Sequence, residues 1–283
     1  MQALTDIESP IAIQGVEGSF HALAARKYFG PDIQLVMSPS FPALFKELDN
    51  EQVGFAVVAI ENSVAGTLMH NYTLLRKGNH RIIGEVYLRI AHNLMAMPGQ
   101  SLPEIQEVYS HPMALAQCQM FFERHPHLRL VEAEDTAGSA QWIQEGQRKG
   151  VAAVASVEAA EVFGLEILAP EIEDNPRNFT RFFIVETNGA GKGDISHASK
   201  ASLCFNLLHQ VGSLAGILQT LAVHELNLTK IQSLPIIGQE WEYFFHLDIE
   251  FDALSAFQEA LTQIQPQVNE LKVLGAYPRG VKL

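Results

Sequence analysis

Cysteine, long apolar runs and positive charge are all scarce in this sequence of 283 residues. The two cysteines, Cys118 and Cys204, are too few for a disulfide framework, and we expect reduced, buried thiols in a cytoplasmic protein. No stretch approaches the roughly 18 uncharged apolar residues of a membrane span. The first ten residues carry Asp6 and Glu8 and no apolar core. We therefore expect neither membrane association nor a signal peptide.

The balance of charge narrows the class of partner. Lysine and arginine total 19 against 32 acidic residues, a formal net charge of −13. A general nucleic-acid partner would need a basic face, so we exclude one. An anionic ligand would have to be bound locally, by a few cations and backbone N–H groups, against the overall field. The CxxC, HExxH and GxGxxG motifs are missing from the sequence, so we expect no metal and no nicotinamide cofactor.

Strand and helix patterns alternate over the first 187 residues. Apolar runs predict buried strands at residues 11–13, 55–60 and 179–186, and helical patterns lie between the strands. Such alternation predicts an α/β fold with a mainly parallel sheet. Periodicity leaves open whether this part forms one domain or two lobes around a cleft.

The pattern changes after residue 187. Residues 188–200 are polar and glycine-rich, which is typical of a linker. Residues 201–283 then show strands and helices in the order βαββαβ, a ferredoxin-like plan. Apolar and polar residues alternate over 241–251, which predicts a half-buried antiparallel strand.

Two clusters of candidate functional residues follow predicted strands. Gly15, Gly18 and Ser19 precede a helix, whose N-terminus can offer free N–H groups to an anion; an ordinary βα turn is the alternative and, for this cluster alone, the simpler explanation. Glu61-Asn62-Ser63 follows the strand at 55–60, at the edge where open α/β sheets bind ligands. A capping role for Asn62 or Ser63 is the alternative there.

Two further clusters lie later in the chain. Ser110-His111-Pro112 opens a helix and Gln117 lies two turns further on; Ser110 as a helix cap is the alternative. On the strand at 179–186, Thr180 and Phe182 share one face, while Arg181 lies on the other. An arginine in an aromatic run needs an anionic partner or an exit to solvent.

The order of these clusters resembles that of the prephenate dehydratase family over nearly the whole chain. The matching motifs are Gly15-x-x-Gly18-Ser19-Phe20, Ile60-Glu61-Asn62-Ser63, Ser110-His111-Pro112 with Gln117-Cys118, and Asn178-x-Thr180-Arg181-Phe182. The resemblance implies a lyase that converts prephenate to phenylpyruvate, carbon dioxide and water in phenylalanine biosynthesis, without a cofactor. It also implies two lobes like those of a periplasmic binding protein, at about 1–77 with 165–187, and at 78–164.

The resemblance assigns roles to individual residues. The catalytic set is Thr180, Asn62, Ser110, Gln117 and Glu61, in which Thr180 assists the departing hydroxide as a hydrogen-bond donor. The substrate-binding set is Gly18, Ser19, Ser63, Arg181 and Phe182. In this set, Arg181 and the N–H groups near Gly18 would receive the substrate carboxylates.

Residues 201–283 resemble an ACT domain, which implies phenylalanine as an effector. The implied allosteric residues are Gly212, Ser213, Leu214, Asn227 and Ser233. The usual Glu-Ser-Arg-Pro motif reads Gln232-Ser233-Leu234-Pro235, so we expect a modified effector site. ACT domains pair, which implies a homodimer or homotetramer, with the strand at 241–251 extending a sheet across a two-fold axis.

Three other functions stay open at this point. One is a non-catalytic sensor that binds an aromatic or amino-acid ligand with the same fold. Another is an NAD-dependent dehydrogenase acting on prephenate, against which the missing GxGxxG motif speaks. The third is a dehydratase that prefers arogenate to prephenate.

Overall fold

The computed structural model describes residues 9–187, 195–207, 210–236, 238, 240 and 242–281. These residues divide into two compact units. The first unit contains residues 9–68 and 86–182, and the second contains residues 69–85 and those from 183 onward. None of the described helices is long and apolar enough to cross a membrane.

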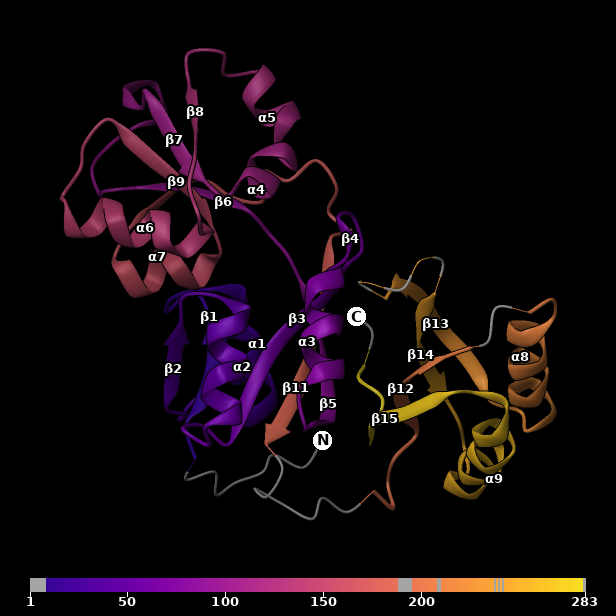
Figure 1. Cartoon of the computed structure of the whole chain (residues 1–283). Helices are drawn as coiled ribbons and strands as arrows, with labels where there is room; N and C mark the ends of the chain where they lie inside the picture. The colour runs from indigo at the N-terminus through magenta and orange to yellow at the C-terminus, as the bar shows by residue number, and fades with distance from the viewer. Residues whose placement is uncertain are drawn as a thin grey trace. The chain divides into compact units, whose positions relative to one another are not determined.

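The first sheet has the strand order β2-β1-β3-β11-β5, with β4 paired to β3 (Figure 1). Strand β1 pairs in parallel with both β2 and β3, and the first six residues of β3 are buried, as in a central parallel strand. Ser19 and Ser40 cap the two helices that connect these strands. The elements are β1 (Ile11–Gln14), α1 (Phe20–Phe29), β2 (Leu35–Ser38), α2 (Phe41–Asp49), β3 (Phe55–Asn62), β4 (Gly66–Thr67), β5 (His80–Arg89) and β11 (Phe179–Thr187).

The second sheet has the order β10-β6-β9-β7-β8 and lies within the first unit. Strands β7, β8 and β9 run parallel, and β6 and β10 run antiparallel to their neighbours. Helices α4 and α5 pack on one face, and α6 and α7 on the other. The elements are β6 (Asn93–Ala96), η1 (Leu102–Glu104), β7 (Glu107–Ser110), α4 (Pro112–Ala116), α5 (Gln119–Glu123), β8 (Arg129–Glu132), α6 (Thr136–Glu145), β9 (Val151–Ala155), α7 (Val157–Phe163) and β10 (Glu166–Ala169).

The chain changes from the first sheet to the second between Arg89 and Asn93, and returns between Ala169 and Phe179. The family resemblance implied lobe boundaries near residues 77 and 165 instead. Residues 85–96 contain neither glycine nor proline. The end of β5 and the start of β6 therefore resemble one extended segment, although the two strands belong to different sheets.

The second unit contains a four-stranded antiparallel sheet of order β13-β14-β12-β15. Its elements follow the chain order βαββαβ, and apolar residues from one face of the sheet form a core with α8 and α9. Residues 188–194 of the predicted linker lie outside the described residues. The elements of this unit are α3 (Met69–Lys77), β12 (Lys200–Asn206), α8 (Ser213–Val223), β13 (Asn227–Pro235), β14 (Tyr243–Glu250), α9 (Leu254–Ile264), η2 (Gln265–Gln267) and β15 (Glu270–Tyr277).

Two expectations about the strand at 241–251 are wrong. Strand β14 lies between β13 and β12, so both of its edges are paired and it cannot extend the sheet. It is also not half-buried, because polar His246 and Asp248 are each only 1% exposed. The ring of Tyr72, on α3, packs 4.9 Å from the ring of His246. The residue that packs on this face therefore comes from a helix more than 160 residues earlier, and the periodicity of the strand does not reveal it. Trp241 lies outside the described residues.

Polar groups continue across the same buried face. Lys200 and Glu85 form an ion pair at 3.0 Å, and each side chain is 1% exposed. The ammonium of Lys272 donates to the carbonyls of Arg76 and Gly78, at the C-terminal end of α3. Removing one partner of a buried ion pair costs about 3–5 kcal/mol. The Lys200–Glu85 pair joins β12 to β5, whereas the bonds of Lys272 join β15 to the end of α3.

Gly275→Ala should destabilise the protein. A methyl group there would lie 2.0 Å from the carbonyl oxygen of Ile82, and the obstacle is backbone. We expect the free energy of unfolding, from urea denaturation, to fall by about 3 kcal/mol, the upper end of the range typical of overpacking.

Gly216→Ala is the matched control for this substitution. Its methyl group would meet only the flexible side chain of Gln267, at 3.4 Å, and alanine favours the helix by up to about 1 kcal/mol. A Gly275→Ala protein as stable as the Gly216→Ala protein would contradict the expected clash.

Candidate functional site

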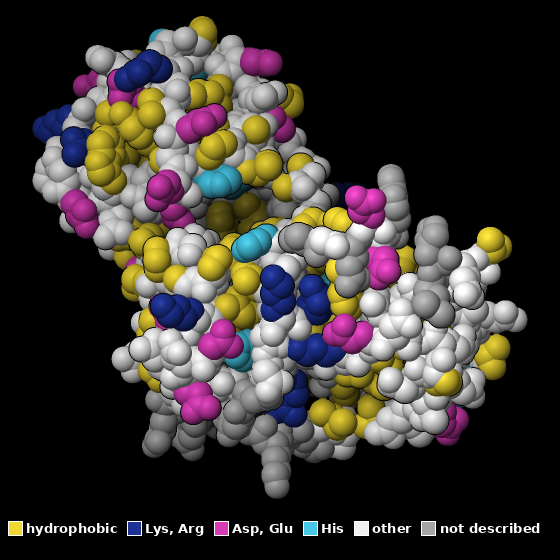
Figure 2. Space-filling view, viewed as in Figure 1, with side chains coloured by type: hydrophobic (Ala, Val, Ile, Leu, Met, Phe, Trp, Pro, Cys, Tyr) yellow, Lys and Arg dark blue, Asp and Glu magenta, His cyan; other side chains and the backbone are white. Residues whose placement is uncertain are grey.

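A cavity of about 560 Å³ lies in the first unit, at the carboxyl ends of β1 and β3. Figure 2 shows a hollow with hydrophobic side chains at its floor and a histidine on each side. Ligands of open α/β sheets bind at this edge. The polar residues that line the cavity are Gln14, Ser19, His21, Ser40, Asn62, His92, His111, Gln117, Glu134, Asp135, Thr136 and Thr180.

Four helices begin at the cavity wall. Their N-cap residues, which all line the cavity, are Ser19 for α1, Ser40 for α2, His111 for α4 and Asp135 for α6. A helix N-terminus carries a partial positive charge and unpaired N–H groups. Among the described residues that line the cavity, none is lysine or arginine. The attraction for an anion must therefore come from backbone dipoles and neutral donors, and it acts against the carboxylates of Glu134 and Asp135, which also line the cavity.

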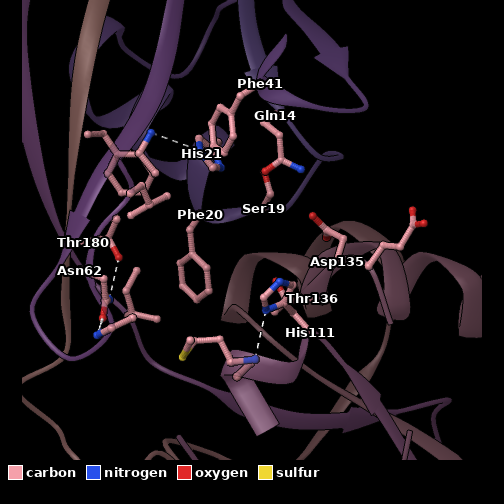
Figure 3. Close-up of a pocket in the computed structure, with 18 of the residues that line it drawn as sticks. Gln14, Ser19, Phe20, His21, Phe41, Asn62, His111, Asp135, Thr136 and Thr180 are labelled. Carbon is pink, nitrogen blue, oxygen red and sulfur yellow. Dashed lines mark hydrogen bonds between the residues drawn. The ribbon is translucent and has the colours of Figure 1, made fainter. Parts of the chain in front are cut away.

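The amide of Asn62 sets the orientation of Thr180. Its Nδ2 group donates to Thr180 Oγ1 at 3.0 Å and to Asn178 Oδ1 at 2.7 Å. Figure 3 shows Asn62 and Thr180 together on one side of the cavity, opposite Asp135. Because the Thr180 oxygen accepts a hydrogen bond from Asn62, its own proton is available to a ligand.

A second pair of hydrogen bonds continues from Asn178. Its Nδ2 group donates to Gln117 Oε1 at 2.9 Å, and the same oxygen lies 2.9 Å from His92 Nε2. Burial lowers the pKa of His92, and Gln117 and Glu173 oppose this only in part. His92 was not among the predicted site residues, because no motif in the sequence marks it.

His21 was also missed, although it directly follows the Gly15-x-x-Gly18-Ser19-Phe20 motif. Its ring packs edge-on against Phe182, with centroids 5.1 Å apart, and lies 5.5 Å from the ring of Phe41. Its Nε2 accepts a hydrogen bond from the Ala59 N–H at 3.4 Å. Burial lowers the pKa of His21 to about 4, so the ring is neutral at neutral pH.

The structure brings five of the predicted catalytic and substrate-binding residues together. These five line the cavity: Ser19, Asn62, Gln117, Thr180 and Phe182. Thr180 and Phe182 share the cavity face of β11, as the two-residue period of a strand predicts.

Three other predicted residues are not among those that line the cavity, and each makes structural contacts. Ser110 is fully buried and donates to the Val154 carbonyl at 2.7 Å. Ser63 Oγ donates to the Arg177 carbonyl and accepts from the Phe179 N–H. Gly18 has a φ of 74°, and a Cβ there would lie 2.8 Å from Ala159 Cα, so only glycine fits.

Arg181 and Glu61 are likewise not among the lining residues. Arg181 is buried and follows Thr180 on β11, with its guanidinium 5.9 Å from the centre of the Tyr87 ring. Glu61 is half-buried on β3 and pairs in register with Thr67 of β4. Their roles in binding and catalysis stay predictions.

The predicted allosteric residues lie in the second unit. Gly212 is the N-cap of α8 with a φ of 87°, and Ser213 and Leu214 follow at the start of that helix. Asn227 and Ser233 lie on β13, an edge strand of the sheet. No cluster of three or more potential metal ligands occurs in the described part of the chain.

Known proteins resemble this chain over most of its length. Residues 11–190 match the family model of prephenate dehydratase. A bifunctional chorismate mutase/prephenate dehydratase of Neisseria gonorrhoeae is 34% identical over 279 residues, or 97% of this chain and 76% of that protein. Arogenate dehydratase/prephenate dehydratase 2 of Arabidopsis thaliana is 35% identical over 278 residues, or 95% of this chain and 72% of that protein.

Two solved structures share the fold over 95% of this chain. GqqA, a novel type of quorum-quenching acylase, superposes with a TM-score of 0.86 at 31% identity and is covered over 98% of its length. Prephenate dehydratase from Arthrobacter aurescens in complex with L-Phe superposes with a TM-score of 0.85 at 28% identity, over 90% of its length.

His21 should make stability depend on pH. An unfolded histidine titrates near pH 6.5 and folded His21 at about 4, so between these values the unfolded state binds more protons. The contribution of neutral His21 to the free energy of unfolding is therefore present above pH 6.5 and is lost as the pH falls towards 4. The ring of phenylalanine suits the space beside Phe182. In His21→Phe, the free energy of unfolding, measured by denaturation at several pH values, should therefore fall less steeply with decreasing pH than in the wild type. Identical pH slopes in variant and wild type would show that His21 titrates normally.

Proposed function

Because the chain belongs to the prephenate dehydratase family, we propose that it converts prephenate to phenylpyruvate, carbon dioxide and water. The observation that carries the proposal is the Thr180 hydroxyl. It lies on the cavity wall, accepts a hydrogen bond from Asn62 and keeps its own proton for a ligand. The departing hydroxide of prephenate is the group that such a donor would assist.

The cavity suits the charge of this substrate. Prephenate is a dianion, and the N-termini of four helices line the cavity. Fixed dipoles stabilise negative charge without the reorganisation that water would need. The new aromatic ring supplies the driving force, so the protein has to supply orientation and electrostatics. Phe20, Phe41 and Phe182 offer apolar surface for the substrate ring.

Thr180 acts in this proposal as a donor rather than as a free-standing acid, because a threonine hydroxyl is a very weak acid. Its hydrogen bond to the leaving oxygen strengthens as the C–O bond breaks and negative charge develops there. Asn62 strengthens the donor by bonding to its oxygen.

An acylase activity, as named for GqqA, is less well supported. A serine hydrolase needs a histidine that accepts the proton of the nucleophile. In this cavity, His21 Nε2 accepts from Ala59, His92 Nε2 bonds Gln117, and His111 Nδ1 accepts from Met113. Burial raises the pKa of the Cys118 thiol, which disfavours a thiolate nucleophile.

We further propose that residues 201–283 form an ACT domain after a linker at 188–200. The βαββαβ order supports this, as does the L-Phe in the Arthrobacter relative. The N-terminus of α8 at Gly212 is suited to the carboxylate of phenylalanine. Leu234, where the family has arginine, is buried opposite Phe244, so apolar packing holds this part of β13.

We propose a homodimer or homotetramer, in which β13 rather than β14 is the strand that meets a second copy. Strand β13 lies at the edge of its sheet, and its Ile231 is 42% exposed. Unpaired edge strands are suited to such pairing.

Purified protein should form phenylpyruvate from prephenate, and Thr180→Val should lower kcat by about 100-fold or more with a smaller change in KM. Valine keeps the shape of threonine and removes the hydroxyl. Thr180→Ser keeps the hydroxyl and serves as the matched control, with most activity retained. Arogenate is assayed in parallel. A folded Thr180→Val protein with wild-type kcat would overturn the role of Thr180, and an inactive wild type would overturn the function.

L-phenylalanine should give binding heat by calorimetry and inhibit turnover over the same concentrations. L-phenylalaninamide is the control, because it lacks the carboxylate that the N-terminus of α8 would bind. Light scattering of the same samples should report a dimer or tetramer. A monomer would contradict the proposed assembly. Absence of both binding heat and inhibition at millimolar phenylalanine would contradict the proposed role of phenylalanine as an effector.

A further inference from the structure

Five side chains form a continuous line of hydrogen bonds beside the cavity. The line runs from His92 through Gln117, Asn178 and Asn62 to Thr180, and its four links measure between 2.7 and 3.0 Å. Four of the five residues line the cavity, and the fifth, Asn178, is 1% exposed. Such a line has a direction, because each link needs one donor and one acceptor.

The direction can be followed from the amides. The Gln117 oxygen accepts from Asn178, so it must also accept from His92, whose Nε2 therefore carries a proton. The Asn178 oxygen accepts from Asn62, whose amide nitrogen also donates to Thr180. The Thr180 oxygen is thus an acceptor within the line, and its proton is left for the cavity.

Other contacts hold His92 and Gln117 in place from outside the line. The N–H of His92 donates to Glu173 Oε2 at 2.9 Å, and its carbonyl accepts from the Ile172 N–H at 2.8 Å. The carbonyl of Gln117 accepts from the Asp174 N–H at 2.7 Å. One short segment, residues 172–174, therefore positions both ends of the His92–Gln117 bond.

The protonation of His92 matches the direction of the line. Burial lowers its pKa, which keeps the ring neutral with a single proton. Its Nδ1 is buried and has no hydrogen-bond partner among the residues that the structure describes, as expected for a bare ring nitrogen. A proton on Nδ1 instead would leave a buried donor unpaired and would turn two acceptors, Nε2 and Gln117 Oε1, towards each other.

We propose that His92 is a positioning residue for the reaction: its Nε2–H holds the amide of Gln117 in place, and Gln117 in turn holds Asn178 against Asn62. The backbone N–H groups of Val64 and Ala65 set which way the Asn62 amide faces, and the contact with Asn178 keeps it in reach of Thr180, which presents its proton to the leaving group. This inference rests on the proposed dehydratase function. His92 acts through Gln117, not by contact with Thr180. If Gln117 turned its amide, its NH2 group would face that of Asn178, and Asn178 would lose the acceptor that holds it against Asn62.

The test compares His92→Gln with His92→Phe. The glutamine amide reaches about as far as Nε2 and can donate to Gln117, whereas phenylalanine keeps the ring shape without a donor. We expect His92→Phe to lower kcat about tenfold or more with KM within about threefold of wild type, and His92→Gln to retain most of kcat. A His92→Phe protein with wild-type kcat, or a His92→Gln protein as impaired as His92→Phe, would overturn the proposal.

A double-mutant cycle separates positioning from simple loss of structure. In a Thr180→Val background, the line no longer ends in a hydroxyl, so adding His92→Phe should lower kcat no further. A second, equally large drop would show that His92 acts independently of Thr180, and would also overturn the proposal.

Nitrogen NMR of the imidazole gives a readout that does not depend on turnover. The wild-type spectrum should show His92 protonated at Nε2 and bare at Nδ1, and Gln117→Leu should disturb this signal. The opposite tautomer would overturn the proposal. A wild-type protein with the expected tautomer but without dehydratase activity would count against the proposed function alone.

Discussion

The side-chain amide of Asn62 is the contact on which the geometry of the cavity depends. Its oxygen accepts from the N–H groups of Val64 and Ala65, and its nitrogen donates to Asn178 and Thr180. All four hydrogen-bonding positions of the amide are therefore used. It ties the turn after β3 to residues more than 110 positions later, and any replacement would leave several partners without a bond.

The positive potential in the cavity comes from neutral groups. The chain carries a net charge of −13, and the described residues that line the cavity include no lysine or arginine. Helix N-termini and amides supply the positive potential instead. These groups do not titrate, and burial keeps His21 and His92 neutral by lowering their pKa values. The carboxylates of Glu134 and Asp135 also line the cavity, so the positive potential that the fold supplies acts beside two acidic side chains.

Patterns within short stretches of sequence, such as strand periodicity and apolar runs, predicted part of the site. The period of a strand placed Thr180 and Phe182 on one face, and the apolar run before Asn62 placed it at a strand end. The same patterns could not assign partners from distant segments. Ser110 suited a helix cap or a catalytic donor, but its hydroxyl donates a hydrogen bond to the Val154 carbonyl, and His111 is the cap.

Two further contacts could not be predicted from short stretches of sequence. One requires a glycine, and the other buries a polar face of a strand. Gly18 was expected to offer N–H groups to an anion, but the close approach of Ala159 explains its lack of a side chain. The polar residues of β14 predicted a solvent-facing surface, and Tyr72 of α3 lies against His246 there. In each case the deciding neighbour lies more than 130 residues away along the chain.

The strand order of the first sheet determines when this protein can fold during its synthesis. Strand β11 lies between β3 and β5, yet it follows both by about 90 residues or more, with the whole second sheet in between. The ribosome therefore releases β1, β2, β3 and β5 long before their sheet can close. At about 5–20 residues per second, the edges of β3 and β5 that later pair with β11 stay without this neighbour for several seconds. Premature strand pairing in that interval is the main hazard that the nascent chain, and any chaperone bound to it, must avoid.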